Sequence, residues 1–230
     1  MGGPTALAFL HTMPASWKRE HLAAFVPISP PFGGAISTVK ALVSGDTLGI
    51  PFVQHALFHP IQSTCASGPW LFPQPSLWPK PQTIVTSGAA VANGSSSTAW
   101  TSSDYVELAG TLGLHQAAAM FDHGVNALAL ASFTAPGVTT EVLRGDGVAT
   151  PATLTYDAPF QSGVVPDAPH VQWEYDGDGT VNGRSLERAS KWVGEQAEPV
   201  RLTRLHNTTH FGILTAKPTL DKLSSILTSL

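Results

Sequence analysis

The sequence lacks the features of a disulfide scaffold, a nucleic-acid binder or a membrane-spanning protein. Among its 230 residues there is one cysteine, Cys65, so no disulfide can form within the chain. Charged residues make up only 12% and the formal net charge is −4, which argues against a nucleic-acid partner. No run of about 20 apolar residues is present, so the sequence predicts no transmembrane helix.

Hydrophobic residues, in contrast, make up 43% of the chain, enough for a substantial core. Buried strands are expected at 23–29, 139–143, 171–175 and 199–205, and helices at 1–12, 35–43, 103–110, 114–131, 184–193 and 219–230. Strands that alternate with helices predict an α/β domain over residues 1–230, with a mainly parallel sheet and helices on both faces.

Two stretches interrupt this alternation. Residues 44–80 are rich in aromatics and prolines and show no helical or strand period, which is typical of a lid-like insertion. Residues 81–131 read as a cap-like insertion. Within it, residues 86–103 are rich in Ser, Gly and Ala and predict a flexible surface loop.

An acidic turn and a distant histidine carry the chemistry. The turn, DGDGTV at 176–181, follows an expected strand, and His210 lies on the loop after the next strand. In the α/β-hydrolase order the nucleophile comes first, then the acid, then the base. Asp178 therefore reads as the acid that orients a catalytic imidazole, and His210 as the base. Gly177 and Gly179 permit the sharp turn that would aim the Asp178 carboxylate inward.

The same turn has two other interpretations. Asp-Gly-Asp-Gly sequences form plain surface turns in many proteins. A calcium loop would use Asp176, Asp178 and Glu187 at its first, third and twelfth positions, but Val181 stands where that loop requires glycine.

Other residue types leave further alternatives open. His206 and His210 are four apart and could bind zinc, although no third ligand lies nearby in the sequence. Ser29 or Cys65 could be the nucleophile of an unrelated hydrolase. No base next to Cys65 is readable from the sequence.

The first residues point to a nucleophile that the chain itself does not contain. Met1-Gly2-Gly3 followed by an apolar helix resembles the second half of a G-x-S-x-G elbow, in which the serine stands on a strand-to-helix turn. We expect that serine immediately before Met1.

Several stretches together resemble the lecithin:cholesterol acyltransferase family, which includes lysosomal phospholipase A2 and the phospholipid:diacylglycerol acyltransferases. The resemblance extends from Met1 to about residue 227 and is weakest between 82 and 130. It is carried by FVPISPPFGG at 25–34, SGDTLGIP at 44–51, PWLFP at 69–73, APGV at 135–138, GDGVATP at 145–151, YDGDGTV at 175–181 and the position of His210.

This resemblance implies the C-terminal part of an α/β-hydrolase, with the first strands of the sheet and the serine upstream. It implies that Asp178 and His210 complete a triad and that the backbone N–H of Met1 is an oxyanion-hole donor. Trp70, Leu71 and Phe72 would belong to a lid that covers the acyl pocket. Neither a cofactor nor a metal is expected.

The implied reaction is acyl transfer from a phospholipid to an acyl-acceptor lipid or to water, through an acyl-serine. The implied partners are those lipids and a peripheral lipid surface, in an endomembrane, secretory or lysosomal-vacuolar lumen. Because losing the nucleophile of a triad costs about 10⁶ in rate, we expect the 230-residue chain as written to be nearly inactive. The alternative is a non-catalytic pseudoenzyme that binds lipid.

Overall fold

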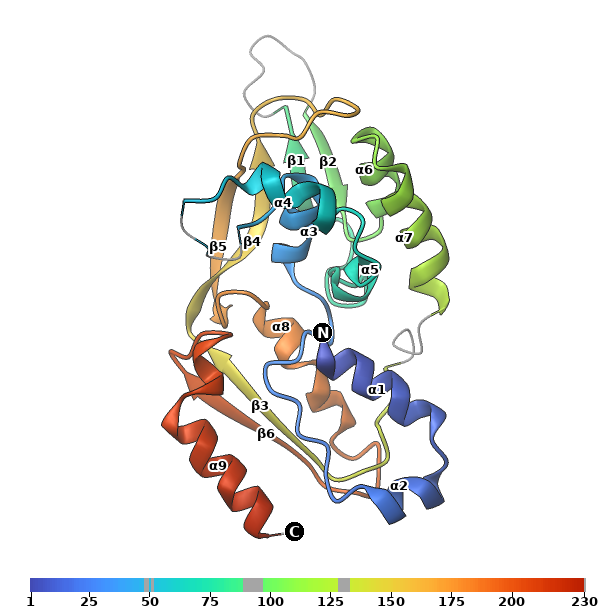
Figure 1. The fold of residues 1–230 in the computed structure, drawn as a ribbon, viewed down its shortest axis with the longest axis vertical. Helices are drawn as coiled ribbons and strands as arrows, with labels where there is room; N and C mark the ends of the chain where they lie inside the picture. Colours follow the sequence, from blue (N-terminus) through green and yellow to red (C-terminus); the bar gives the residue numbers. More distant parts are fainter. Residues whose placement is uncertain (48–49, 51, 89–96, 128–132, 230) are drawn as a thin grey trace. The chain divides into compact units, whose positions relative to one another are not determined.

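The chain folds into two compact units, which are described separately (Figure 1). The computed structural model describes residues 1–47, 50, 52–88, 97–127 and 133–229. Unit 1 comprises Met1–Gly33, Leu128–Thr150 and Glu174–Leu230, and unit 2 comprises Gly34–Ala127 and Pro151–Trp173.

Parallel strand pairing organises unit 1. Strands β3 (Thr140–Asp146) and β6 (Val200–His206) pair in parallel over their full length. Residues 25–29 run along the opposite edge of β3, where Phe25 and Ile28 form parallel bridges to Thr140 and Leu143. The strands expected at 139–143 and 199–205 are confirmed, and the expected strand at 23–29 pairs as two isolated bridges.

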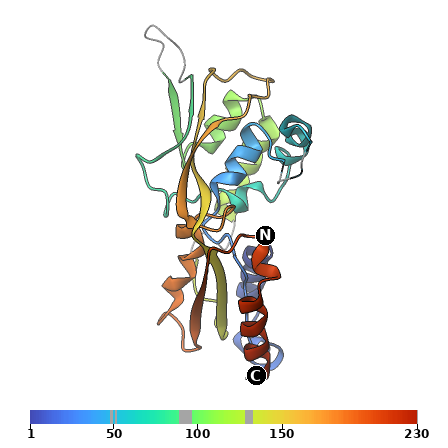
Figure 2. The same cartoon turned by 90° about the vertical axis from the view of Figure 1, so that its left-hand side faces the viewer.

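Helices flank this layer on both sides, as the alternating pattern predicts. Figure 2 shows α1 and α9 on one side of β3 and β6, and the segment with the 3-10 helix η2 on the other. The helical segments of unit 1 are α1 (Gly2–Thr12), α2 (Ala15–His21), α8 (Gly183–Leu186), η2 (Arg188–Trp192), η3 (Gly212–Leu214) and α9 (Lys217–Thr228).

Aromatic packing fixes η2 to unit 1. The rings of Phe133 and Trp192 stack with centroids 4.6 Å apart, and Phe32 meets Trp192 edge-on at 5.2 Å. The indole N–H of Trp192 donates to the carbonyl oxygen of Phe133 at 3.1 Å, so this buried donor is satisfied. Burial of each such ring is worth roughly 1.5–3 kcal/mol.

The four-stranded sheet has the strand order β2-β1-β4-β5 and includes both parallel and antiparallel pairing. β1 pairs with β4 in parallel but with β2 antiparallel. The expected parallel pairing is therefore found in β3–β6 and β1–β4, and β1–β2 adds one antiparallel pair to it. The strands are β1 (Thr83–Ser87), β2 (Thr98–Thr101), β4 (Val148–Tyr156) and β5 (His170–Gly177).

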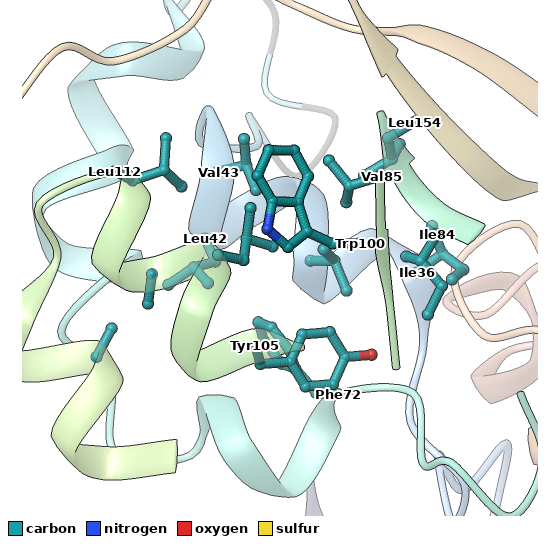
Figure 3. Close-up of a cluster of buried hydrophobic side chains, with 14 of the residues drawn as sticks. Ile36, Leu42, Val43, Phe72, Ile84, Val85, Trp100, Tyr105, Leu112 and Leu154 are labelled. Carbon is teal, nitrogen blue, oxygen red and sulfur yellow. The ribbon is translucent and has the colours of Figure 1, made fainter. Parts of the chain in front are cut away.

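Unit 2 has its own apolar core, which brings together residues from helices and strands (Figure 3). Trp100 lies at its centre, close to Leu42, Val43 and Val85. The helices of unit 2 are α3 (Ile36–Val43), α4 (His55–Gln62), α5 (Gly68–Leu71), α6 (Tyr105–Thr111) and α7 (His115–Ala127).

Two expectations about unit 2 need correction. The stretch 44–80 was expected to be irregular, yet it contains α4 and α5, short helices that its prolines obscure in the sequence. The stretch 86–103 was expected to be loop throughout, yet it contains the end of β1 and all of β2. Residues 48, 49, 51, 89–96 and 128–131 of the predicted lid and cap lie outside the described residues, and both assignments remain predictions.

Candidate active site

The acidic turn places Asp178 in the interior of unit 1. Its side chain is fully buried, and its Oδ1 accepts hydrogen bonds from the backbone N–H groups of Thr180 at 3.1 Å and Val181 at 2.8 Å. Gly179 has a φ of +90°, a conformation that favours glycine. These charge-assisted bonds offset part of the cost of burying the carboxylate.

His210 meets Asp178 through both its ring and its backbone. Its Nδ1 lies 2.8 Å from Oδ2 of Asp178, and its backbone N–H donates to the carbonyl oxygen of Asp178 at 2.8 Å. A carboxylate can only accept, so Nδ1 carries the proton and Nε2 is left as an acceptor in the neutral ring. Among the described residues none is hydrogen-bonded to Nε2, and the side chain is 25% exposed.

The pair lies at the carboxyl end of β3, on one face of the β3–β6 layer. A Cβ placed on Gly145 would lie 3.1 Å from Cβ of Asp178, so Gly145 faces this carboxylate. Side chains alternate between the two faces of a strand, so Arg144 and Asp146 point to the opposite face. There they line a hollow of about 500 Å³ together with Arg204.

The predicted oxyanion donor Met1 caps the amino end of α1, and the residue is 42% exposed. Both views place this terminus at the end of unit 1 where β3 and β6 have their carboxyl ends (Figures 1 and 2). A helix that starts directly after Met1 is the local structure that follows the serine in a nucleophile elbow. The role of Met1 remains a prediction.

Within the described part of the chain, neither alternative nucleophile is hydrogen-bonded to an imidazole. Ser29 is buried, and its Oγ accepts a hydrogen bond from the N–H of Gly145 at 3.4 Å. Cys65 is exposed, and its sulfur lies 3.0 Å from Oγ of Ser67, a hydrogen bond that lowers the pKa of the thiol. Neither contact supplies a base that could remove a proton.

The side chains considered for metal binding are engaged elsewhere. Glu187 forms ion pairs with Arg144 at 2.5 Å and with Arg204 at 3.0 Å. His206 pairs with Asp146 at 3.0 Å. In the part of the chain that the structure describes, no group of three or more His, Cys, Asp or Glu could hold a metal ion. The calcium and zinc alternatives therefore have no ligand set there.

The predicted lid residues differ in their burial. Phe72 is buried in the core of unit 2, where its ring meets those of Tyr105 at 4.8 Å and Phe121 at 4.6 Å. These three rings also line a hollow of about 310 Å³. Trp70 and Leu71 are half-buried. Whether these residues contact substrate stays a prediction.

Sequence reasoning missed the residues that support the acidic turn. The hydroxyl of Thr150 accepts the N–H of Gly179 at 2.9 Å, and the amide of buried Asn182 donates to Glu174 at 2.5 Å. Burial raises the pKa of the Glu174 carboxyl, and the negative charge of Asp176 adds to the shift. Thr150 lies in β4, a strand that the sequence pattern did not predict. No sequence motif indicated Glu174 or Asn182.

The fold and the pair define a mixed α/β protein with a buried Asp–His contact where its parallel strands end. The model of the family described as "Lecithin:cholesterol acyltransferase" matches residues 1–128, more than half of the chain. The chain belongs to the lecithin:cholesterol acyltransferase family.

Curated relatives match along nearly the whole chain. Phosphatidylcholine-sterol acyltransferase from Oryctolagus cuniculus and that from Homo sapiens are each 31% identical over 221 residues, covering 96% of this chain and 47% of theirs. Lysosomal phospholipase A and acyltransferase from Bos taurus is 30% identical over 228 residues, or 99% of this chain and 52% of its own. The chain thus spans about half the length of the curated relatives it matches. None of the helices described is long and apolar enough to cross a membrane.

Proposed function

We propose that this chain supplies the acid, the base and one oxyanion donor of a lipid O-acyltransferase or phospholipase. The observation that supports this proposal is the 2.8 Å contact between Nδ1 of His210 and Oδ2 of buried Asp178. The nucleophile is a serine that directly precedes Met1 in the complete polypeptide. Family membership and the names of the matched relatives support a phospholipid as acyl donor.

In the first half of the reaction, the serine Oγ attacks the carbonyl carbon of an acyl ester while Nε2 of His210 takes the hydroxyl proton. The backbone N–H of Met1 donates to the resulting oxyanion. Asp178 keeps Nδ1 protonated and stabilises the imidazolium. When the tetrahedral intermediate collapses, the ester C–O bond breaks and His210 gives its proton to the leaving lysophospholipid oxygen. The acyl group stays on the serine.

In the second half, the hydroxyl of an acceptor lipid or of water attacks the acyl-serine. His210 takes the proton of this nucleophile, and the serine leaves with a proton from His210. The product is an acylated lipid or a free fatty acid. The half-buried Trp70 and Leu71 serve as the lid-like apolar surface for the acyl chain, at a peripheral lipid surface, and Phe72 of the same predicted lid segment packs in the core of unit 2.

The test uses the complete polypeptide with its upstream residues. Acyl release and transfer from phosphatidylcholine vesicles are measured for the unaltered protein, for His210→Ala and for alanine at the serine preceding Met1. Each replacement is expected to lower kcat by about 10⁶, and a fluorophosphonate probe should label that serine and not Ser29. Full activity in His210→Ala, or labelling of Ser29 alone, would overturn the proposal.

A further inference from the structure

Unit 1 contains a second Asp–His contact close to the first. Oδ1 of Asp146 lies 3.0 Å from Nδ1 of His206, and the two residues are register partners at the ends of β3 and β6. Asp146 is mostly buried, with 14% of its side chain exposed, whereas the His206 side chain is 76% exposed. An isolated exposed ion pair adds little stability. A functional effect of this contact would therefore come from the position in which it holds His206.

The two pairs lie on opposite faces of the same strand end. Asp146 and His206 lie on the face away from Gly145, and Asp178 lies on the face toward it. The chain crosses between the faces at Asn207, whose φ of +53° is in the left-handed region. The loop that carries His210 therefore wraps around the end of β3.

Glycine at position 147 lets the imidazole of His206 come close. A Cβ at Gly147 would lie 2.8 Å from Cε1 of His206 and 2.8 Å from Oδ1 of Asn207. The Asp146 carboxylate is itself held beside Arg144, whose Nη2 lies 3.9 Å from Oδ2. His206, which directly precedes the loop, is thus held by the Asp146 carboxylate and lies close to Gly147.

We propose that Asp146 and His206 form a positioning pair that sets the place of His210, on the premise that His210 is the catalytic base proposed above. Only three residues separate the two histidines, so the loop is anchored at one end by Asp146 and at the other by Asp178. Releasing the first anchor lets His210 shift relative to Asp178. A displaced catalytic base reduces the rate of the chemical step more than it weakens substrate binding.

The experiment measures kcat and KM of the complete enzyme for His206→Ala, His206→Asn and Asp146→Asn. His206→Ala should lower kcat roughly tenfold with little change in KM, because a small displacement of the catalytic base from its productive geometry slows the chemical step. His206→Asn keeps an N–H donor near the position of Nδ1 and should retain most of kcat. Unchanged kcat in His206→Ala, or an Asn variant no better than the Ala variant, would overturn the inference.

The chain offers a matched control in unit 2. His170 and Asp157 form a pair at 3.1 Å, and the His170 side chain is also 76% exposed. His170→Ala should leave kcat unchanged. An equal loss in His170→Ala and His206→Ala would mean a general effect of surface pairs and would contradict the inference.

A readout without turnover separates this inference from the proposed function. The proton on Nδ1 of His210, held by the Asp178 carboxylate, should give a downfield resonance in the proton NMR spectrum. His206→Ala should broaden or lose it, and His206→Asn should keep it. If the resonance survives in His206→Ala, the positioning role fails whatever the assay shows. If His210→Ala is fully active, the proposed function fails instead.

Discussion

A Cβ placed on Gly145 would lie 2.1 Å from the carbonyl oxygen of Thr208, so these two residues can approach only because position 145 has no side chain. Gly145 belongs to β3, and Thr208 lies two residues before His210. The close approach presses the histidine loop onto the strand end beside Asp178. A backbone contact of this kind cannot be relieved by rotating a side chain.

Replacing Gly145 by alanine should therefore displace the loop and lower both activity and stability. Overpacking at a backbone contact typically costs about 1–3 kcal/mol, measured here as a fall in the free energy of unfolding in urea. Gly110 is the control, since it lies exposed in α6 with nothing within 4 Å of its would-be Cβ. Gly110→Ala should raise stability by about 0.5–1 kcal/mol. A Gly145→Ala variant as stable and active as the parent would contradict the tight contact.

The assignment of the acid is tested by two asparagine replacements on one turn. Asp178→Asn in the complete enzyme should lower kcat by about 10⁴, because the amide no longer holds the His210 ring in the required tautomer. Asp176→Asn, two residues away and exposed, should lower it far less. If circular dichroism shows both variants to be folded and their losses in kcat are equal, the assignment of Asp178 as the triad acid is contradicted.

The elements that the sequence predicted are those with a clear period or a clear motif. β3 and β6 are compact apolar or alternating runs, and the acidic turn has glycines on both sides of Asp178. β4 was missed because Pro151 and the preceding Gly147 read as a turn. A proline is tolerated in a strand where its missing N–H would not have paired. Such a position depends on neighbours that local sequence does not specify.

The residues that support the site were not predicted either, because their roles also depend on neighbours that are distant in the sequence. Asn182 reads as an ordinary polar residue after a turn, yet it is fully buried and bonded to Glu174. The pairing of Asp146 with His206 depends on the register between strands 60 residues apart. Register is set by the packing of the whole sheet, so no local pattern could specify it.

The raised pKa of Glu174 predicts how stability depends on pH. A carboxyl whose pKa is higher in the folded state binds more protons there, so its contribution favours the folded state at low pH. That contribution is lost as the pH rises from the ordinary value of 4.5 through the raised one. Glu174→Gln, which stays neutral, should match the parent at about pH 4 and exceed its urea midpoint at pH 7. Glu20→Gln, with a 75% exposed side chain, is the control and should change neither. A Glu174→Gln midpoint below that of the parent at pH 7 would mean that the charged form is favoured.

The predicted lid can be separated from core packing by comparing two aromatic residues. Phe72→Ala removes a buried ring and should cost about 3–5 kcal/mol of unfolding free energy. Trp70 is half-buried, so Trp70→Ala should cost less stability. If Trp70 contacts the acyl chain, its replacement should raise KM for long-chain phosphatidylcholine more than for a short-chain ester. Equal changes in KM for the two substrates would place Trp70 outside the acyl site. A stable, fully active Phe72→Ala variant would contradict its place in the core.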